Sequence, residues 1–122
     1  MLNLKNNLPQ AKQGEDLAAA YLRKKNYRIL QQNFRSRTGE IDIVAISQNT
    51  LVFVEVKSRW SVEYGSPLEA VTPKKLKKII KTAQYFKLLN PETPDLLRID
   101  VVGIDFTRGQ SPQIDHIENI TG

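Results

Sequence analysis

Two apolar segments joined by a short polar turn constrain the fold of this chain more than any other feature. Residues 40–46 and 51–57 are rich in β-branched side chains, and the polar residues 47–50 (Ser-Gln-Asn-Thr) separate them. β-Branched residues favour strands, and a turn of this length joins antiparallel strands. Both segments are apolar on both faces, which is typical of a sheet covered on both sides. The sequence therefore predicts a β-hairpin inside a layered domain.

Two segments outside the hairpin predict helices. Apolar residues recur at helical spacing over residues 10–25 and again over residues 73–89. The second helix has a clear start, because Thr72 suits the N-cap and Pro73 suits the first helical position.

Two more strands are indicated at residues 27–34 and 97–105. The strand at 51–57, the second helix and the strand at 97–105 then form a right-handed crossover between parallel strands. Residues 113–120 have an ambiguous period and add at most an edge strand. The predicted order is α-β-β-β-α-β, an α/β three-layer sandwich with a mixed sheet between helices.

The length of 122 residues, with 40% hydrophobic content, predicts one domain over residues 1–122, with its core at about 10–105 and a C-terminal tail at 106–122. The absence of cysteine excludes disulfides, thiolate zinc sites and a cysteine nucleophile. The N-terminus is polar, and no stretch approaches the ~20 apolar residues of a membrane span. We therefore expect a cytoplasmic protein with no membrane partner.

The net charge of +5 is unevenly distributed along the chain. Residues 21–39 and residues 73–90 each hold six basic residues and no acid, whereas residues 40–72 hold five acids and two bases. Two basic segments on either side of an acidic one suit a protein that binds a polyanion with its basic residues and acts on it with its acidic residues. Solvated helix and loop faces explain such charge runs equally well.

The second basic segment carries a candidate nucleic-acid-binding face. Four lysines and one aromatic residue gather opposite the apolar stripe of the helix: Lys74, Lys77, Lys78, Lys81 and Tyr85. Lysines contact phosphates, and an aromatic ring contacts a base or a sugar. The alternative is a solvated face with a half-buried tyrosine.

The hairpin register brings two carboxylates together. If the turn has two or four residues, positions whose numbers sum to 97 pair, so Asp42 lies opposite Glu55 and Glu40 lies opposite Lys57. Directly opposed side chains have Cβ atoms about 4.5–5.5 Å apart. Glu55 and Lys57 share one face, because side chains alternate along a strand. A three-residue turn would break this arrangement.

Two carboxylates on an apolar sheet destabilise it unless a cation compensates their charge. Hard divalent ions such as Mg²⁺ prefer carboxylate oxygens and leave positions open for a phosphate oxygen. Lys57 can orient an attacking water or stabilise charge on the phosphate. These groups suit metal-assisted phosphodiester hydrolysis. The alternative is an ion pair of Lys57 with Asp42 or Glu40, without a metal.

The remaining titratable residues give weaker signals. Glu15 lies at the edge of the apolar stripe of the first helix, which is more typical of a first-turn residue favoured by the helix dipole. His116 is the single histidine, has no partner motif, and is expected at the surface or on an edge strand. The sequence has neither a Gly-rich phosphate loop nor a Gly-x-Ser-x-Gly elbow.

An ordered set of motifs over residues 13–105 resembles a known family. Asp42 followed, after a spacer, by Glu55-Val56-Lys57 resembles the PD-(D/E)XK nuclease signature. The whole set of motifs resembles the YraN-type endonuclease family. The motifs are Gly14-Glu15 with Ala18, Asn33-Phe34-Arg35, Gly39-Glu40-Ile41-Asp42, Phe53-Val54-Glu55-Val56-Lys57-Ser58-Arg59, Tyr64-Gly65 and Arg98-Ile99-Asp100-Val101-Val102.

The resemblance implies a restriction-endonuclease-like fold related to archaeal Holliday junction resolvases. It implies that Glu15, Asp42 and Glu55 form a metal site with Lys57 beside them, which makes Glu15 a fourth member of the site. This chain has Ile41 where the family usually has proline before the aspartate.

The main hypothesis is a Mg²⁺- or Mn²⁺-dependent DNA endonuclease. Its expected substrates include branched DNA or junctions. Arg35, Arg37 and Arg59 join the lysine face as candidate phosphate contacts. A homodimer is a further expectation, because two-fold dimers are common among the junction-cutting relatives. Two rivals are a non-catalytic nucleic-acid-binding or assembly module that retains the nuclease fold and a protein-interaction adaptor.

Overall fold

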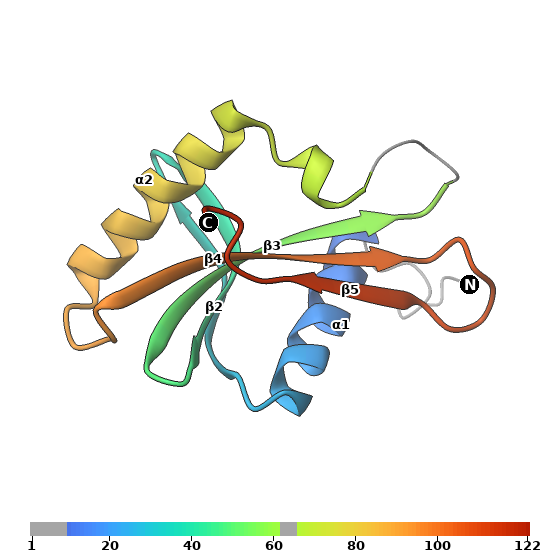
Figure 1. Ribbon diagram of the computed structural model, residues 1–122, viewed down its shortest axis with the longest axis horizontal. Coiled ribbons are helices and arrows are strands. Elements are labelled where there is room, and N and C mark those ends of the chain that lie inside the picture. Colours follow the sequence, from blue (N-terminus) through green and yellow to red (C-terminus); the bar gives the residue numbers. More distant parts are fainter. Residues whose placement is uncertain (1–9, 62–65) are drawn as a thin grey trace, which may run out of the picture.

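The computed structural model describes residues 10–61 and 66–122, and Figure 1 shows their arrangement. Tyr64 and Gly65, which belong to the family-like motifs, lie outside these described residues. The same is true of the polar N-terminal residues 1–9.

A five-stranded mixed sheet forms the middle layer, with the strands in the order β1-β2-β3-β4-β5. Strands β3 and β4 are parallel, and the other neighbours are antiparallel. The two helices cover opposite faces of this sheet (Figure 1). The predicted α/β three-layer sandwich is therefore confirmed. The elements are α1 (Gln10–Lys24), β1 (Arg28–Ser36), β2 (Gly39–Ser47), β3 (Thr50–Arg59), a 3₁₀ turn (Leu68–Ala70), α2 (Pro73–Leu89), β4 (Leu96–Asp105) and β5 (Gln113–Ile117).

The hairpin between β2 and β3 has a two-residue turn. Gln48 and Asn49 both have positive φ, 47° and 63°, as a type I′ turn requires. Ser47 therefore pairs with Thr50, and the register predicted from the sequence is confirmed up to the pair of Ile43 with Val54.

The paired ladder between β2 and β3 ends one step before the predicted pair of Asp42 with Glu55. The reason is that the Asp42 carboxylate itself accepts the backbone N–H of Val56 at 2.7 Å. The predicted pair of Glu40 with Lys57 is also absent from this ladder, and on the other side of β2 Glu40 pairs with Arg35 of β1.

Each face of the sheet carries its own hydrophobic core. Alternate residues of β2, β3 and β4 point to α1 on one face and to α2 on the other. Val54 and Val102 pack on the α1 side, and Phe53 and Ile99 pack on the α2 side. This explains why the central strands are apolar on both faces.

Helix α1 is rotated relative to the predicted apolar stripe. Leu17, expected on the stripe, is 36% exposed, whereas Glu15, expected at its edge, is 8% exposed. Gly14 allows this packing, because a Cβ atom there would lie 1.9 Å from Oγ and 3.2 Å from Cβ of Ser58 on β3. The close approach of α1 to β3 turns Glu15 toward the sheet.

Helix α2 begins and ends where the sequence predicts. The Thr72 side chain accepts the backbone N–H of Lys75 at 3.2 Å, and Pro73 occupies the first helical position. The helix is tied to the β1–β2 turn, because the hydroxyls of Thr38 and Thr82 are 2.8 Å apart.

Within the described part of the chain, neither helix is long and apolar enough to cross a membrane.

Candidate active site

Asp42 and Glu55 lie close together near the end of the β2–β3 ladder. Glu55 is 8% exposed, and Asp42 is half-buried. The hydrogen bond from the backbone N–H of Val56 holds Asp42 beside the residue that follows Glu55 on β3. The predicted proximity of the two acids is therefore present, although a side-chain-to-backbone contact replaces the expected backbone pair.

The environment of Asp42 favours its neutral form. Burial, and then the nearby Glu55 carboxylate, raise the pKa of Asp42 to about 7, while the N–H of Val56 opposes that change. The carboxyl pair thus carries more negative charge than its surroundings stabilise. Such a pair is an acceptor for a cation or a proton.

Two lysines surround Glu55. Nζ of Lys57, on the same strand, lies 3.6 Å from Oε1 of Glu55, and Nζ of Lys75, on α2, lies 2.8 Å from the same oxygen. Burial and the neighbouring Lys75 lower the pKa of Lys57, while Glu55 acts in the opposite direction. The alternative ion pair of Lys57 with Asp42 or Glu40 is not the one observed, because Lys57 pairs with Glu55.

Sequence reasoning missed Lys75 as a member of this site. The signal was present, because Lys75 precedes Ile79 by four residues and therefore lies on the buried face of the helix. Burial opposes its charge, but the bonds to Glu55 and Lys57 and the charges of Glu55 and Asp42 together outweigh burial and raise the pKa of Lys75.

Glu15 approaches the pair from α1. Its charge acts on the pKa of Asp42, and Asn33 forms a hydrogen bond with its carboxylate. Burial raises the pKa of Glu15. Its Oε1 atom is buried and has no hydrogen-bond partner among the described residues. A buried carboxylate oxygen without a partner costs free energy, so this atom is ready to accept a water or a ligand.

The donor chemistry of the cluster fits a hard divalent cation. Asp42, Glu55 and Glu15 offer carboxylate oxygens, the ligands that Mg²⁺ and Mn²⁺ prefer. Over residues 10–61 and 66–122, no three histidine, aspartate or glutamate side chains are already arranged to hold a metal ion. Mg²⁺ usually takes only one or two protein carboxylates and keeps several waters. The cluster is therefore closest to a two-carboxylate site.

The candidate phosphate contacts lie mostly at the surface. The four lysines of α2 (Lys74, Lys77, Lys78 and Lys81) are exposed, and Tyr85 is 43% exposed beside the Phe34 ring. Arg37 is exposed in the β1–β2 turn that contacts α2. Arg35 is exposed and forms an ion pair with Glu40 at 3.2 Å. Arg59 is the last residue of β3 and lines a pocket there.

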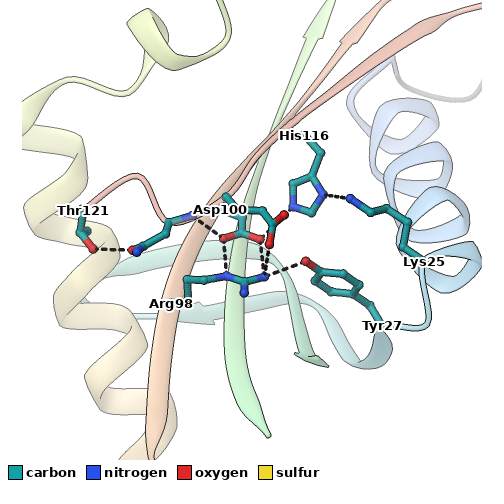
Figure 2. A network of polar contacts seen from close by, with 8 residues as sticks. Lys25, Tyr27, Arg98, Asp100, His116 and Thr121 are labelled. Carbon is teal, nitrogen blue, oxygen red and sulfur yellow. Dashed lines mark hydrogen bonds and ion pairs between the residues drawn. The ribbon is translucent and has the colours of Figure 1, made fainter. Parts of the chain in front are cut away.

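A second polar cluster, which sequence reasoning also missed, links α1 to β4 and β5 (Figure 2). Asp100 is completely buried and accepts hydrogen bonds from Arg98 at 2.9 and 3.1 Å and from the backbone N–H of Asn119 at 2.9 Å. Arg98 also donates to the hydroxyl of Tyr27 at 2.7 Å. The signal in the sequence was an Arg-x-Asp pair on one face of an otherwise apolar strand.

His116 completes this second cluster. His116 lies on the edge strand β5, so the expectation of an edge-strand position is confirmed. The expectation of a surface position is wrong, because only 2% of its side chain is exposed. Nε2 lies 2.8 Å from Asp100, and Nδ1 lies 2.9 Å from Nζ of Lys25. A lysine ammonium can only donate a hydrogen bond, so Nδ1 accepts the bond from Lys25. Nε2 then carries the ring proton and donates a hydrogen bond to the Asp100 carboxylate. The cluster joins distant segments and has a structural role.

A three-layer α/β sandwich with one buried carboxylate, one half-buried carboxylate and two lysines at the end of a central hairpin defines a small protein with a candidate acid–lysine site. The chain belongs to the uncharacterised protein family UPF0102, whose model matches residues 14–104.

Three relatives illustrate the similarity, and all three are named UPF0102 protein. One from Persephonella marina is 46% identical over 110 residues, which cover 90% of each chain. One from Geobacter metallireducens is 49% identical over 106 residues, covering 87% of this chain and 86% of the relative. One from Chlorobium limicola is 49% identical over 111 residues, covering 86% and 85%.

Proposed function

We propose that this protein is a Mg²⁺- or Mn²⁺-dependent DNA endonuclease of the PD-(D/E)XK type, with branched DNA or junctions among its substrates. One observation carries the proposal: the half-buried carboxylate of Asp42 and the buried carboxylate of Glu55 share a site with Lys57, the next residue on the same face of β3 as Glu55. The pattern of acid, acid and lysine suits hydrolysis of a phosphodiester.

Asp42 and Glu55 would hold the metal ion directly, and Glu15 would act through a water. The unpartnered oxygen of Glu15 supports this role. A bound divalent ion supplies Lewis acidity and lowers the pKa of its water. Lys57 positions the attacking water or offsets the charge that develops on the phosphate. In the reaction, the water oxygen bonds to phosphorus, the bond from phosphorus to the leaving oxygen breaks, and that oxygen takes up a proton.

Helix α2 supports DNA as the partner. Its first turn supplies Lys75 to the candidate site, and its exposed lysines continue from there along the helix. The exposed lysines and Lys75 belong to one helix, so a duplex held on these lysines would lie along the element that reaches Glu55. A homodimer remains a prediction of the resemblance to junction-cutting enzymes.

The test is cleavage of junction, flap and duplex DNA by the purified protein with Mg²⁺ or Mn²⁺. We expect Glu55→Gln and Lys57→Ala to lower the cleavage rate about 100-fold or more, the scale of losing one stabilising group at a reacting phosphate. Asp95→Asn is the matched control, because its carboxylate is 98% exposed and pairs only with Lys87 among the charged groups described. Equal cleavage by Glu55→Gln and wild type would reject the assignment.

A non-catalytic nucleic-acid-binding or assembly module is the second candidate. It is favoured by the ion pair of Lys75 with Glu55, which already compensates one carboxylate without a metal. Calorimetric titration with Mn²⁺ separates the two candidates. An endonuclease requires a divalent-ion site that is lost in Asp42→Asn and Glu55→Gln, whereas a module binds DNA without such a site.

A further inference from the structure

A pocket of about 580 Å³ lies beside the candidate site, at the ends of β3 and β4. Ligand pockets typically enclose about 300–1,000 Å³, a range that includes the size of one nucleotide. One wall is firmly built, because Pro67 packs on Gly103, where a Cβ atom would lie 2.1 Å from Cγ of the proline. The proposed endonuclease mechanism uses only Lys57 among the residues that line this pocket.

An aromatic platform forms part of the lining. Trp60 lines the pocket, is 37% exposed, and stacks on Phe106 with ring centroids 3.8 Å apart and an interplanar angle of 7°. The backbone N–H of Phe106 donates to the carbonyl of Arg59 at 2.8 Å, so the two rings are held by paired strand ends. An ordered indole at the rim of a pocket is a surface on which a base can stack.

Charged groups around the platform suit a nucleotide. Among the described residues, three cationic side chains line the pocket, Lys57, Arg59 and Arg108, against two acids, Asp105 and Asp115. Asp105 is engaged by Thr107 at 2.8 Å and by Arg108 at 3.5 Å. The cations can contact phosphates, and the exposed carboxylate of Asp115 can accept a hydrogen bond from an exocyclic amine.

The pocket is continuous with the candidate site through Lys57. Lys57 lines the pocket and also forms the ion pair with Glu55. A nucleotide with its base at Trp60 would therefore lie next to a phosphate at Lys57. A base paired within a duplex keeps both faces stacked on its neighbours, so only an unpaired base can use an aromatic platform.

We propose that this pocket binds one unpaired nucleotide at the edge of a DNA duplex, with its base stacked on Trp60 and its phosphates at Arg59 and Arg108. This inference rests on the proposed function for the phosphodiester at Lys57. It names the substrate class more narrowly, as DNA with an unpaired nucleotide next to a duplex, such as a flap, a fork or a tailed end.

Trp60 is the single tryptophan of the chain, so its fluorescence reports directly on the pocket. The experiment titrates the full-length protein, in EDTA to prevent cleavage, with two duplexes that carry a short single-stranded tail. One has a normal base at the first unpaired position, and the other has an abasic site there. We expect the normal tail to quench Trp60 and to bind about fivefold or more tighter than the abasic tail, the scale of one base stacked on an aromatic ring.

Variants are compared by the anisotropy of labelled DNA at one fixed salt concentration. Trp60→Ala should remove the preference for the normal base over the abasic site, and Trp60→Phe should retain most of it. Leu88→Ala, a truncation at a 77% exposed position on α2, should leave the preference unchanged. Thermal unfolding of each variant verifies that it is folded.

The outcomes separate this inference from the proposed endonuclease. Equal affinity for both tails, without quenching of Trp60, would overturn the pocket assignment even if the protein cleaves DNA with Mn²⁺. A clear preference for the normal base would support nucleotide binding in the pocket even if no cleavage is detected. In that case only the proposal of endonuclease activity would be rejected.

Discussion

Nζ of Lys75 lies 2.8 Å from Oε1 of Glu55, closer than Lys57, whose Nζ lies 3.6 Å from the same oxygen. The nearest cation to this buried carboxylate therefore comes from the first turn of α2 and not from the strand that carries Glu55. The ammonium of Lys75 compensates a carboxylate that a divalent ion would otherwise compensate. Lys75 and the proposed metal ion would thus compete for Glu55.

This competition predicts the effect of removing Lys75 on metal binding. Lys75→Met should bind Mn²⁺ about tenfold more tightly than wild type, because Glu55 loses its closest competing cation and a tenfold change needs only ~1.4 kcal/mol. Titration calorimetry without DNA measures this. Lys24→Met, an exposed lysine on α1, is the control for net charge. Unchanged or weaker Mn²⁺ binding by Lys75→Met would refute the competition.

The close approach of α1 to β3 predicts a large effect at Gly14. Gly14→Val should lower the free energy of unfolding by about 2 kcal/mol more than Ala20→Val, because the added atoms meet Ser58. Ala20 is exposed on the same helix, so it reports the propensity cost of valine alone. Urea unfolding measures both. Equal losses would mean that the helix shifts without cost and that Gly14 does not position Glu15.

The lysine face of α2 predicts the salt dependence of DNA binding. Lys77→Gln combined with Lys81→Gln should reduce the slope of log affinity against log salt by about two, because each phosphate contact releases about one counterion. Anisotropy of labelled duplex in EDTA measures the slope. The charge-matched control combines Lys12→Gln with Lys24→Gln, two exposed positions on the helix at the opposite face of the sheet. If both double variants change the slope equally, the lysine face of α2 is not the DNA-binding surface.

The buried cluster around Asp100 predicts a pH dependence of stability. Burial acts to raise the pKa of Asp100, but bonds from His116, Arg98 and the N–H of Asn119 outweigh it, and the pKa lies below its usual range. An acid whose pKa is lowered by folding stabilises the fold above its unfolded pKa, near 4, and this contribution disappears as the pH falls through the folded pKa.

Asp100→Asn should therefore cost about 3 kcal/mol at pH 7, because the half-buried Arg98 loses its buried partner and keeps only the more exposed Glu118, at 3.2 Å, as an ion-pair partner among the described residues. The difference from wild type should be narrower at pH 3, below the unfolded pKa, because unfolding of wild type then takes up a proton at Asp100. Urea unfolding at both pH values measures it. Asp95→Asn, at a 98% exposed position, should change stability by less than about 0.5 kcal/mol. A constant difference at both pH values would contradict the pKa argument.

The strands and helices followed from local patterns. The turn residues Gln48 and Asn49 set a two-residue hairpin, and Thr72 with Pro73 set the start of α2. Neighbouring residues decide such features, and for that reason the sequence predicts them well. The proximity of Asp42 and Glu55 belongs to the same class, because a hairpin joins them over a short stretch of chain.

The packing of helices on the sheet required the tertiary structure. The apolar pattern of α1 predicted Leu17 inward and Glu15 at an edge, but the contact of Gly14 with Ser58 rotated the helix and buried Glu15. The spacing of apolar residues defines an apolar face about 100° wide on the helix. The positions of small residues such as Gly14 then decide which part of that face lies closest to the sheet.

The sequence alone determined the α/β sandwich, the hairpin register up to the pair of Ile43 with Val54, and the presence of two acids and a lysine on one hairpin. The tertiary structure decided that Lys75 reaches Glu55, that Glu15 is buried without a partner for Oε1, and that His116 pairs with Asp100. The physical reason is separation along the chain. Local patterns specify neighbours within an element, whereas these contacts join residues that meet only after whole elements have packed.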